Sequence, residues 1–197
     1  MIINHAQKTV QTKIVYYGPA MSGKTTSLKA LFKILGKDNG LTSIETTTGR
    51  TLFFDFGNLV FRGTEWDIKI SLYTATGQDF YKSTRPATLY GADAIIFVVD
   101  SQQGLLKYNK ESWNELKKFY PDNIRKIPIV VCLNKYDLEN VVSENTIKFE
   151  FKLESLDNVN TITSIATEGK GIGEAFSTVM KQLFPNFKLE LQEEVCA

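Results

Sequence analysis

The chain has 197 residues, of which 43% are hydrophobic and 23% charged, and its formal net charge at pH 7 is +1. This length suits one globular domain, so we expect residues 1–197 to form a single domain with a frayed tail over 192–197. A net charge so close to zero gives no reason to expect nucleic acid or an anionic membrane as a partner.

The cysteines and the apolar runs favour a cytoplasmic protein without a stable membrane anchor. Cys132 lies inside an apolar run, where we expect a core residue, and Cys196 lies near the end. The two make neither a metal-binding spacing nor a disulfide framework. The apolar runs have the length of strands, and residues 1–10 lack the pattern of a signal peptide. Cys196 is also in the wrong position for prenylation.

The first half of the chain predicts a strand, a helix, a polar loop and a hairpin. Residues 12–17 are β-branched and aromatic, and a helical stripe follows residue 25 at Leu28, Leu31, Phe32 and Leu35. The stretch 36–50 is polar and has no periodicity, so we expect a loop. Two strand-like runs follow, 51–61 and 66–74, and the turn between them contains Gly63, which predicts an antiparallel hairpin.

The second half alternates strands with helices. Strands are expected over 93–100, 127–133 and 160–166, and amphipathic helices over 108–120 and 171–184. This alternation predicts an α/β fold with a mostly parallel six-stranded sheet, one antiparallel hairpin strand, helices on both faces and a possible extra strand at the N-terminus. In such folds the ligand binds at the carboxyl ends of the strands.

A phosphate-binding loop occupies residues 18–25, Gly-Pro-Ala-Met-Ser-Gly-Lys-Thr, between the first strand and the first helix. In this G-x-x-x-x-G-K-[ST] pattern, backbone N–H groups cradle phosphate oxygens at a helix N-terminus. We expect Lys24 to reach the β- and γ-phosphates and the Thr25 hydroxyl to ligate Mg²⁺. The residues expected to bind the nucleotide here are Gly18, Ala20, Met21, Ser22, Gly23, Lys24, Thr25 and Thr26.

A second motif, Asn134-Lys135-Tyr136-Asp137, follows a buried strand. The Asp137 carboxylate can accept two hydrogen bonds from the N1–H and the amino group of guanine, and adenine has no such donor pair. We expect Asn134 to tie this loop to its neighbours and the Lys135 stem to lie over the base plane.

The strand-end pair Ala166-Thr167 adds a weaker signal for the same base. A backbone N–H near Ala166 is expected to meet the guanine O6. The two motifs and this pair together predict a guanine nucleotide, GTP or GDP.

With these residues in view, the chain resembles the Ras-like small GTPases, which are P-loop NTPases, over nearly its whole length. The matching segments are 18–25, 134–137 and 165–167. Within that superfamily it is most similar to the MglA-type polarity GTPases of bacteria and their archaeal relatives, through 13–19, 50–56 (Arg-Thr-Leu-Phe-Phe-Asp-Phe) and 166–171. The resemblance implies a Ras-like G domain.

The γ-phosphate end of the site departs from the usual pattern. Small GTPases usually present D-x-x-G-Q, but the segment here is 74–78, Thr-Ala-Thr-Gly-Gln, and the MglA type shares this loss of the acid. We expect the Gly77 N–H to meet the γ-phosphate and Gln78 to orient the attacking water. Our hypothesis is that Asp55 supports the Mg²⁺ ion instead, and Asp100 is the other candidate.

The polar loop supplies two further candidates through the resemblance. It favours Thr51 as the Mg²⁺ ligand in the GTP state, although the threonines at 46–48 compete by position. It also implies that Arg50 acts like an arginine finger held in the same chain, the alternative being a solvated loop arginine. Lys82 and Arg85, along a predicted helix, are expected to be surface charges.

These expectations describe a switch that binds GTP, hydrolyses it slowly and responds through the loops around 37–54 and 75–90. The resemblance implies a Roadblock/LC7-type GTPase activator, and we expect an effector and a monomer. One alternative is a pseudo-GTPase with negligible turnover, which the missing acid at Thr74 favours and Gln78 and Arg50 disfavour. Another is a P-loop kinase, against which the 134–137 motif argues.

Overall fold

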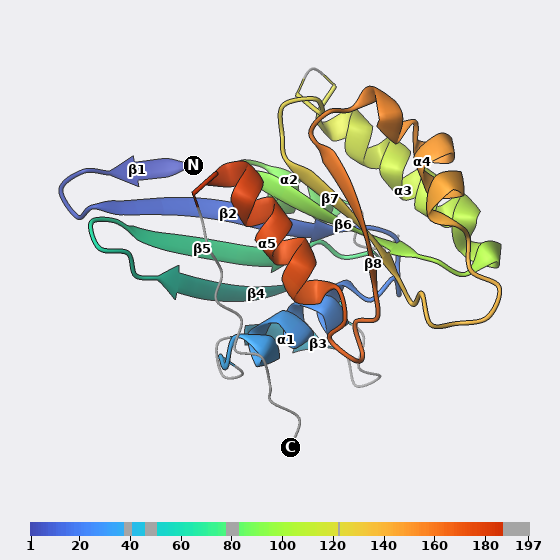
Figure 1. Ribbon diagram of the computed structural model, residues 1–197, viewed down its shortest axis with the longest axis horizontal. Helices are drawn as coiled ribbons and strands as arrows, with labels where there is room; N and C mark the ends of the chain where they lie inside the picture. Colours follow the sequence, from blue (N-terminus) through green and yellow to red (C-terminus); the bar gives the residue numbers. More distant parts are fainter. Residues whose placement is uncertain (38–40, 46–50, 78–82, 122, 187–197) are drawn as a thin grey trace.

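The computed structural model describes residues 1–37, 41–45, 51–77, 83–121 and 123–186. Its centre is a sheet whose strands lie in the order β3-β4-β5-β2-β6-β7-β8, with β1 paired to β2 (Figure 1). The strands are β1 (Ile2–Asn4), β2 (Thr9–Tyr17), β3 (Leu41–Glu45), β4 (Thr51–Phe61), β5 (Asp67–Thr74), β6 (Ala94–Asp100), β7 (Ile129–Asn134) and β8 (Val159–Ser164).

The parallel part of the sheet contains its most apolar strands. β5, β2, β6, β7 and β8 pair in parallel, and every residue of β6 and β7 is buried. Strands covered by helices on both faces need apolar residues at successive positions, which explains these unbroken runs. β4 runs antiparallel to β5, so the predicted hairpin is confirmed.

The sheet is wider than the six strands predicted. Within the described residues it has eight, because β1 adds the extra N-terminal strand and β3 pairs antiparallel with β4. The prediction of a loop over 36–50 is therefore wrong for Leu41–Glu45. This short edge strand is held by backbone pairing, interrupted by an irregularity between Ser43 and Glu45, and its sequence shows no strand periodicity.

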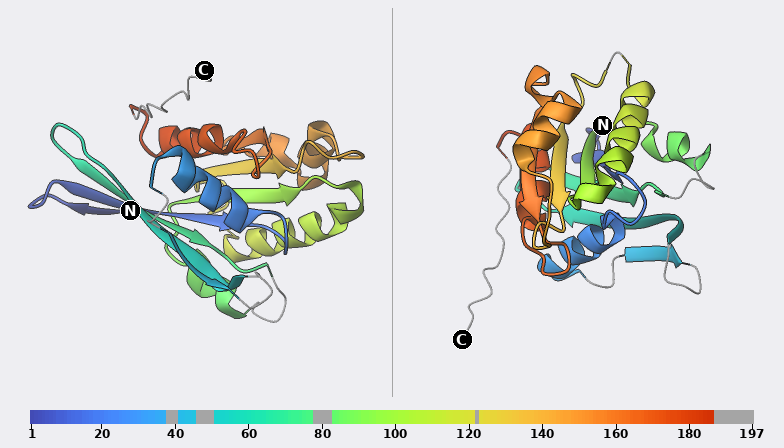
Figure 2. Two further views of the ribbon diagram at one scale, coloured as in Figure 1. Left: turned by 90° about the horizontal axis from the view of Figure 1, so that it is seen from below. Right: turned by 90° about the vertical axis from the view of Figure 1, so that its right-hand side faces the viewer.

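Helices cover both faces of the sheet, as expected (Figure 2). α1 (Lys24–Ile34) and α5 (Ile172–Leu183) pack on one face, and α2 (Arg85–Leu89), α3 (Leu106–Phe119) and α4 (Glu144–Phe151) on the other. Because side chains alternate along a strand, β2 sends Ile14 to the first layer and Val15 to the second. Cys132 is buried in the first layer, which confirms the predicted core cysteine.

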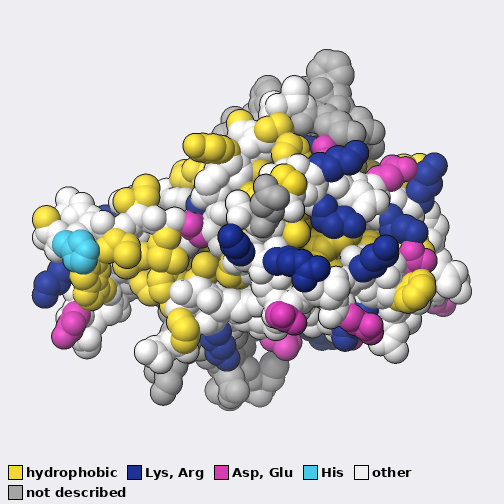
Figure 3. Space-filling model, turned by 90° about the horizontal axis from the view of Figure 1, so that it is seen from above, with side chains coloured by type: hydrophobic (Ala, Val, Ile, Leu, Met, Phe, Trp, Pro, Cys, Tyr) yellow, Lys and Arg dark blue, Asp and Glu magenta, His cyan; other side chains and the backbone are white. Residues whose placement is uncertain are grey.

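The two ends of the sheet differ in character. The outer ends of β1, β2, β4 and β5 extend beyond the helices, and hydrophobic side chains gather there (Figures 2 and 3). His5 packs edge-on against Trp66 at this end, with ring centroids 5.3 Å apart. The carboxyl ends of β2, β6, β7 and β8 lie at the opposite end, where α1 begins. None of the described helices has the length and apolarity needed to cross a membrane.

Candidate nucleotide-binding site

The phosphate loop leaves β2 at Tyr17 and enters α1 at Lys24. Gly18 and Gly23 have φ angles of +143° and +99°, and a Cβ atom at either would lie 2.2 Å from another atom, the Val98 carbonyl oxygen or the Asn134 amide nitrogen. Both positions therefore require glycine. Gly23 is also the N-cap of α1 and gives no side chain to cap it, so the first N–H groups of the helix can serve a ligand.

Lys24 is buried and bends back over this loop. Its Nζ donates to the carbonyl oxygens of Gly18, at 3.0 Å, and Pro19, at 2.6 Å. Burial, and after it the positive charge of Arg85, lowers the pKa of Lys24 to about 7, while the charge of Asp55 opposes the shift. A buried ammonium of this kind is stabilised by an anion, because the anion favours its charged form. The environment of Lys24 thus suits a phosphate group.

A buried carboxylate lies beside Thr25. Thr25 Oγ1 donates to Asp55 Oδ2 at 2.5 Å, and Thr74 Oγ1 donates to the same oxygen at 2.8 Å. Thr74 Oγ1 also accepts the backbone N–H of Asp55 at 2.7 Å. The β4–β5 register pairs Phe56 with Tyr73, so the next position brings Asp55 beside Thr74. The threonine that replaces the usual acid therefore holds an acid from the neighbouring strand.

The surroundings of Asp55 fit a magnesium ion. Asp55 is 0% exposed, and among the described residues its Oδ1 has no hydrogen-bond partner. A buried polar atom without a partner calls for an explanation, and hydroxyl and carboxylate oxygens are ligands that Mg²⁺ prefers. Thr25 Oγ1 and the Asp55 carboxylate supply both types within one hydrogen bond of each other.

Asp100, the competing acid, is engaged elsewhere. Its Oδ2 accepts from Lys135 Nζ at 2.5 Å, and its Oδ1 accepts from the backbone and side-chain nitrogens of Gln102 at 3.2 and 3.1 Å. Asp100 thus holds Lys135, a residue of the 134–137 motif. The geometry favours Asp55 over Asp100 beside Thr25.

A pocket of about 240 Å³ unites the sequence motifs. It is lined by Met21, Gly23, Thr26, Asn134, Lys135, Asp137, Leu138, Ile165, Ala166 and Thr167. These residues come from the phosphate loop and the start of α1, from the end of β7 and the loop after it, and from the loop after β8, which are far apart in the sequence. The expected phosphate-binding and base-binding residues therefore meet in one place.

Asn134 links the three loops around this pocket. Its Nδ2 donates to the Ser22 carbonyl at 2.8 Å, and its Oδ1 accepts the Ala166 N–H at 2.9 Å. The Ala166 N–H, expected near the guanine O6, is thus directed to Asn134. The next amide, that of Thr167, is the neighbouring candidate for that contact.

Several expected residues lie outside the described part of the chain. These are Arg50, Gln78, the threonines at 46–48, Lys82 and the tail over 192–197; Thr51 begins β4. Gly77 is described, and a Cβ atom on it would lie 2.4 Å from both Cα and N of Ala20. The loop after β5 therefore lies directly against the phosphate loop.

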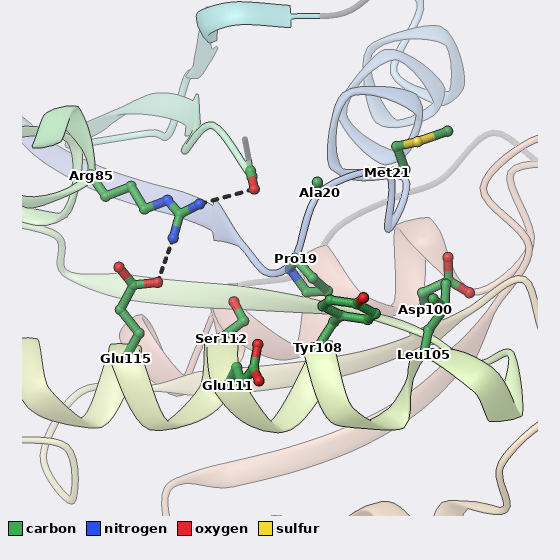
Figure 4. A pocket seen from close by; sticks show the side chains of 11 residues that line it. Pro19, Ala20, Met21, Arg85, Asp100, Leu105, Tyr108, Glu111, Ser112 and Glu115 are labelled. Carbon is green, nitrogen blue, oxygen red and sulfur yellow. Dashed lines mark hydrogen bonds and ion pairs between the residues drawn. The ribbon is translucent and has the colours of Figure 1, made fainter. Parts of the chain in front are cut away.

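Arg85 corrects one expectation. Predicted as a surface charge, it is 5% exposed and donates to the Thr76 carbonyl oxygen. It also donates to the Gly77 carbonyl oxygen and to Glu115 (Figure 4). It lines a second pocket, of about 330 Å³, between the phosphate loop and α3. A single arginine in a polar run gives no sequence signal of burial, because its partners are backbone atoms and a residue thirty positions away.

A phosphate loop at the start of α1 and a pocket beyond the ends of β7 and β8 define a nucleotide-binding protein of the P-loop class. The chain matches the ADP-ribosylation factor family over residues 1–183 and belongs to that family of small GTPases. It is 35% identical to the mutual gliding-motility protein MglA of Myxococcus xanthus, over 94% of this chain and 97% of that protein. The Ras-like and MglA-type resemblance seen in the sequence is confirmed.

Two relatives of lower identity are also GTPases or ADP-ribosylation factor-like proteins by name. ADP-ribosylation factor-like protein 5 of Dictyostelium discoideum is 26% identical over 79% of this chain and 77% of that protein. GTPase Der of Thermoanaerobacter pseudethanolicus is 31% identical over 87% of this chain, which corresponds to 37% of that longer protein. The likeness to Der therefore concerns only a part of it.

Proposed function

We propose that the protein binds GTP and GDP with Mg²⁺, hydrolyses GTP slowly to GDP and phosphate, and acts as a molecular switch. The observation that carries the proposal is the pocket in which Asp137 and the phosphate loop line the same space. A carboxylate that lines this pocket can accept two hydrogen bonds from a base with paired donors, as guanine has. Membership of the small GTPase family supports the same conclusion.

In this proposal the residues from Gly18 to Thr26 hold the phosphates, and Lys24 offers its charge to the β- and γ-phosphates. Asp137 accepts from the guanine edge, Lys135 covers the base plane and the Thr167 N–H replaces that of Ala166 at O6. The Asp100–Lys135 ion pair supports the role of Lys135 over the base plane, because it fixes the end of this long side chain.

Thr25 and Asp55 are the residues proposed to hold Mg²⁺, with Thr51 joining them in the GTP state. When bound, the ion neutralises charge that develops between the β- and γ-phosphates. Thr74 orients Asp55 through two hydrogen bonds. This arrangement weakens the argument for a pseudo-GTPase, because the acid absent at position 74 is replaced by one on the neighbouring strand.

Hydrolysis itself is assigned to Gln78, which would orient the water, and to Arg50 as an arginine finger in the same chain. Both assignments rest on the family resemblance. So do the proposals of a Roadblock/LC7-type activator and an effector. We further propose a cytoplasmic monomer of one domain, with switch loops around 37–54 and 75–90.

The test is to titrate fluorescent GDP, GTP and ATP into the purified chain with Mg²⁺ and then to follow phosphate release from GTP. We expect selective binding of the guanine nucleotides and slow release that Arg50→Ala reduces about a thousandfold without weakening binding. Guanine binding without any phosphate release would establish the pseudo-GTPase instead. Stronger binding of ATP than of GTP would contradict the proposal as a whole.

A further inference from the structure

Arg85 lies outside the phosphate loop but contacts Thr76 and Gly77, the segment expected to meet the γ-phosphate. It is the first residue of α2, and its side chain turns inward, so that only 6% of it is exposed. Nε donates to the Thr76 carbonyl at 2.9 Å. Nη2 donates to the Gly77 carbonyl at 2.9 Å and Nη1 to Glu115 Oε2 at 2.5 Å (Figure 4). One guanidinium thus joins a loop to a helix.

The two carbonyl contacts constrain the loop strongly. A guanidinium is planar and its donors form a rigid fork, so it fixes the directions of both carbonyls together. In a planar trans peptide, the Thr76 C=O and the Gly77 N–H lie in one plane and point in opposite directions. Holding the Thr76 oxygen therefore aims the Gly77 N–H away from Arg85. Gly77 itself lies against the phosphate loop, because a Cβ atom on it would come within 2.4 Å of Ala20.

Glu115 gives this arrangement a rigid anchor. It lies on α3 next to the buried Trp113 and Leu116, and its side chain is 17% exposed. A buried guanidinium is costly unless a carboxylate and further acceptors satisfy it, and Glu115 supplies that charge. Burial and then the charge of Glu115 raise the pKa of the neighbouring Tyr17 phenol, while the charge of Arg85 opposes the shift.

We propose that Arg85, anchored by Glu115, is a positioning residue that aims the Gly77 N–H at the γ-phosphate. This inference rests on the proposed function, and it assigns to the Arg85–Glu115 pair the preference for triphosphate over diphosphate. Its charge sits on the far side of the peptide from the nucleotide, so Arg85 acts through Gly77 and makes no contact with the phosphate in this role.

The experiment measures the affinities of the full chain for GDP and for 5′-guanylyl imidodiphosphate, a GTP analogue that is not hydrolysed, with Mg²⁺. The variants are Arg85→Lys, which keeps the charge and loses the fork, and Glu115→Gln, which keeps an acceptor and loses the charge. Arg125→Gln is the control, because Arg125 also donates to a backbone carbonyl, that of Ser155 at 2.7 Å, on an exposed site.

We expect Arg85→Lys and Glu115→Gln each to weaken the binding of the analogue about tenfold and the binding of GDP less than about twofold. Only the triphosphate uses the Gly77 N–H. The control should change neither. Equal losses for GDP and the analogue, or no loss, would overturn the role of Arg85. Absence of turnover by the wild-type chain would instead refute the proposed hydrolysis, and the affinity ratio would still report on Arg85.

Discussion

At the scale of single residues, two carboxylates show how partners decide a role. From the sequence alone, Asp55 and Asp100 are both candidates to support Mg²⁺. Asp100 uses its oxygens on Lys135 and Gln102, whereas Asp55 accepts from Thr25 and Thr74 and leaves Oδ1 without a partner among the described residues. These contacts support the proposal that Asp55, and not Asp100, serves Mg²⁺.

Asp55→Asn should weaken the binding of GDP in Mg²⁺ by about tenfold to a hundredfold, the usual effect of altering a residue that supports a metal. In EDTA the variant and the wild-type chain should bind alike, because the carboxylate then has no ion to serve. Thr74→Val is expected to show a smaller loss of the same kind, with Thr74→Ser as its control. Titration of GDP at several Mg²⁺ concentrations measures this, and equal Mg²⁺ dependence in Asp55→Asn and wild type would exclude the role.

At the scale of elements, the loops after β7 and β8 are joined to the phosphate loop by one side chain. Asn134 Nδ2 bonds the Ser22 carbonyl and Oδ1 bonds the Ala166 N–H, so removal of this amide leaves two buried backbone groups unsatisfied. Each costs about 1–3 kcal/mol. The three loops are then free to move relative to one another.

Asn134→Ala is therefore expected to speed the dissociation of GDP by about tenfold or more. The matched control is Asn158→Ala, because the Asn158 side chain also binds two backbone groups, here by donating to the carbonyls of Ile124 and Ile127 at 2.7 and 2.5 Å, away from the nucleotide pocket. It should lower stability without changing dissociation. Stopped-flow chase of fluorescent GDP decides the matter, and similar rates in both variants would show that Asn134 is only structural.

The elements also show what the sequence can and cannot reveal. β4 occupies its predicted range, 51–61, because the polar stretch before it and the turn with Gly63 after it mark both ends of a strand-like run. The phosphate loop and the 134–137 motif could be predicted because their spacing is local. β3, the burial of Arg85 and the Asn134–Ala166 bond could not, since they depend on backbone partners or on residues distant in the chain.

At the scale of the whole molecule, an aromatic cluster fixes α3 and α4 on the sheet. Trp113 stacks on Phe151 with centroids 5.2 Å apart, and Phe97 of β6 meets both rings edge-on. Trp113 Nε1 also donates to the Phe151 carbonyl at 3.1 Å. α3 carries Glu115, so this cluster also determines where the anchor of Arg85 lies.

Phe151→Ala should lower the free energy of unfolding by about 3–5 kcal/mol, because it opens a cavity in a closely packed core. Phe151→Leu should lower the free energy of unfolding by a smaller amount. Neither should change the ratio of GTP to ATP affinity, since Phe151 does not line the nucleotide pocket. Urea unfolding measures the free energy of unfolding, and titration of fluorescent GTP and ATP measures the affinity ratio. A change in base preference would mean that the cluster shapes the pocket directly.

Selection of guanine by Asp137 is tested most directly by the affinity of Asp137→Asn for GDP and for xanthosine diphosphate. Xanthine has a carbonyl where guanine has its amino group, so an amide at position 137 can donate where the carboxylate could only accept. We expect the variant to lose GDP affinity by about a hundredfold or more and to prefer the xanthine nucleotide. A variant that binds GDP as tightly as the wild-type chain and ignores xanthosine diphosphate would contradict the assignment of the pocket.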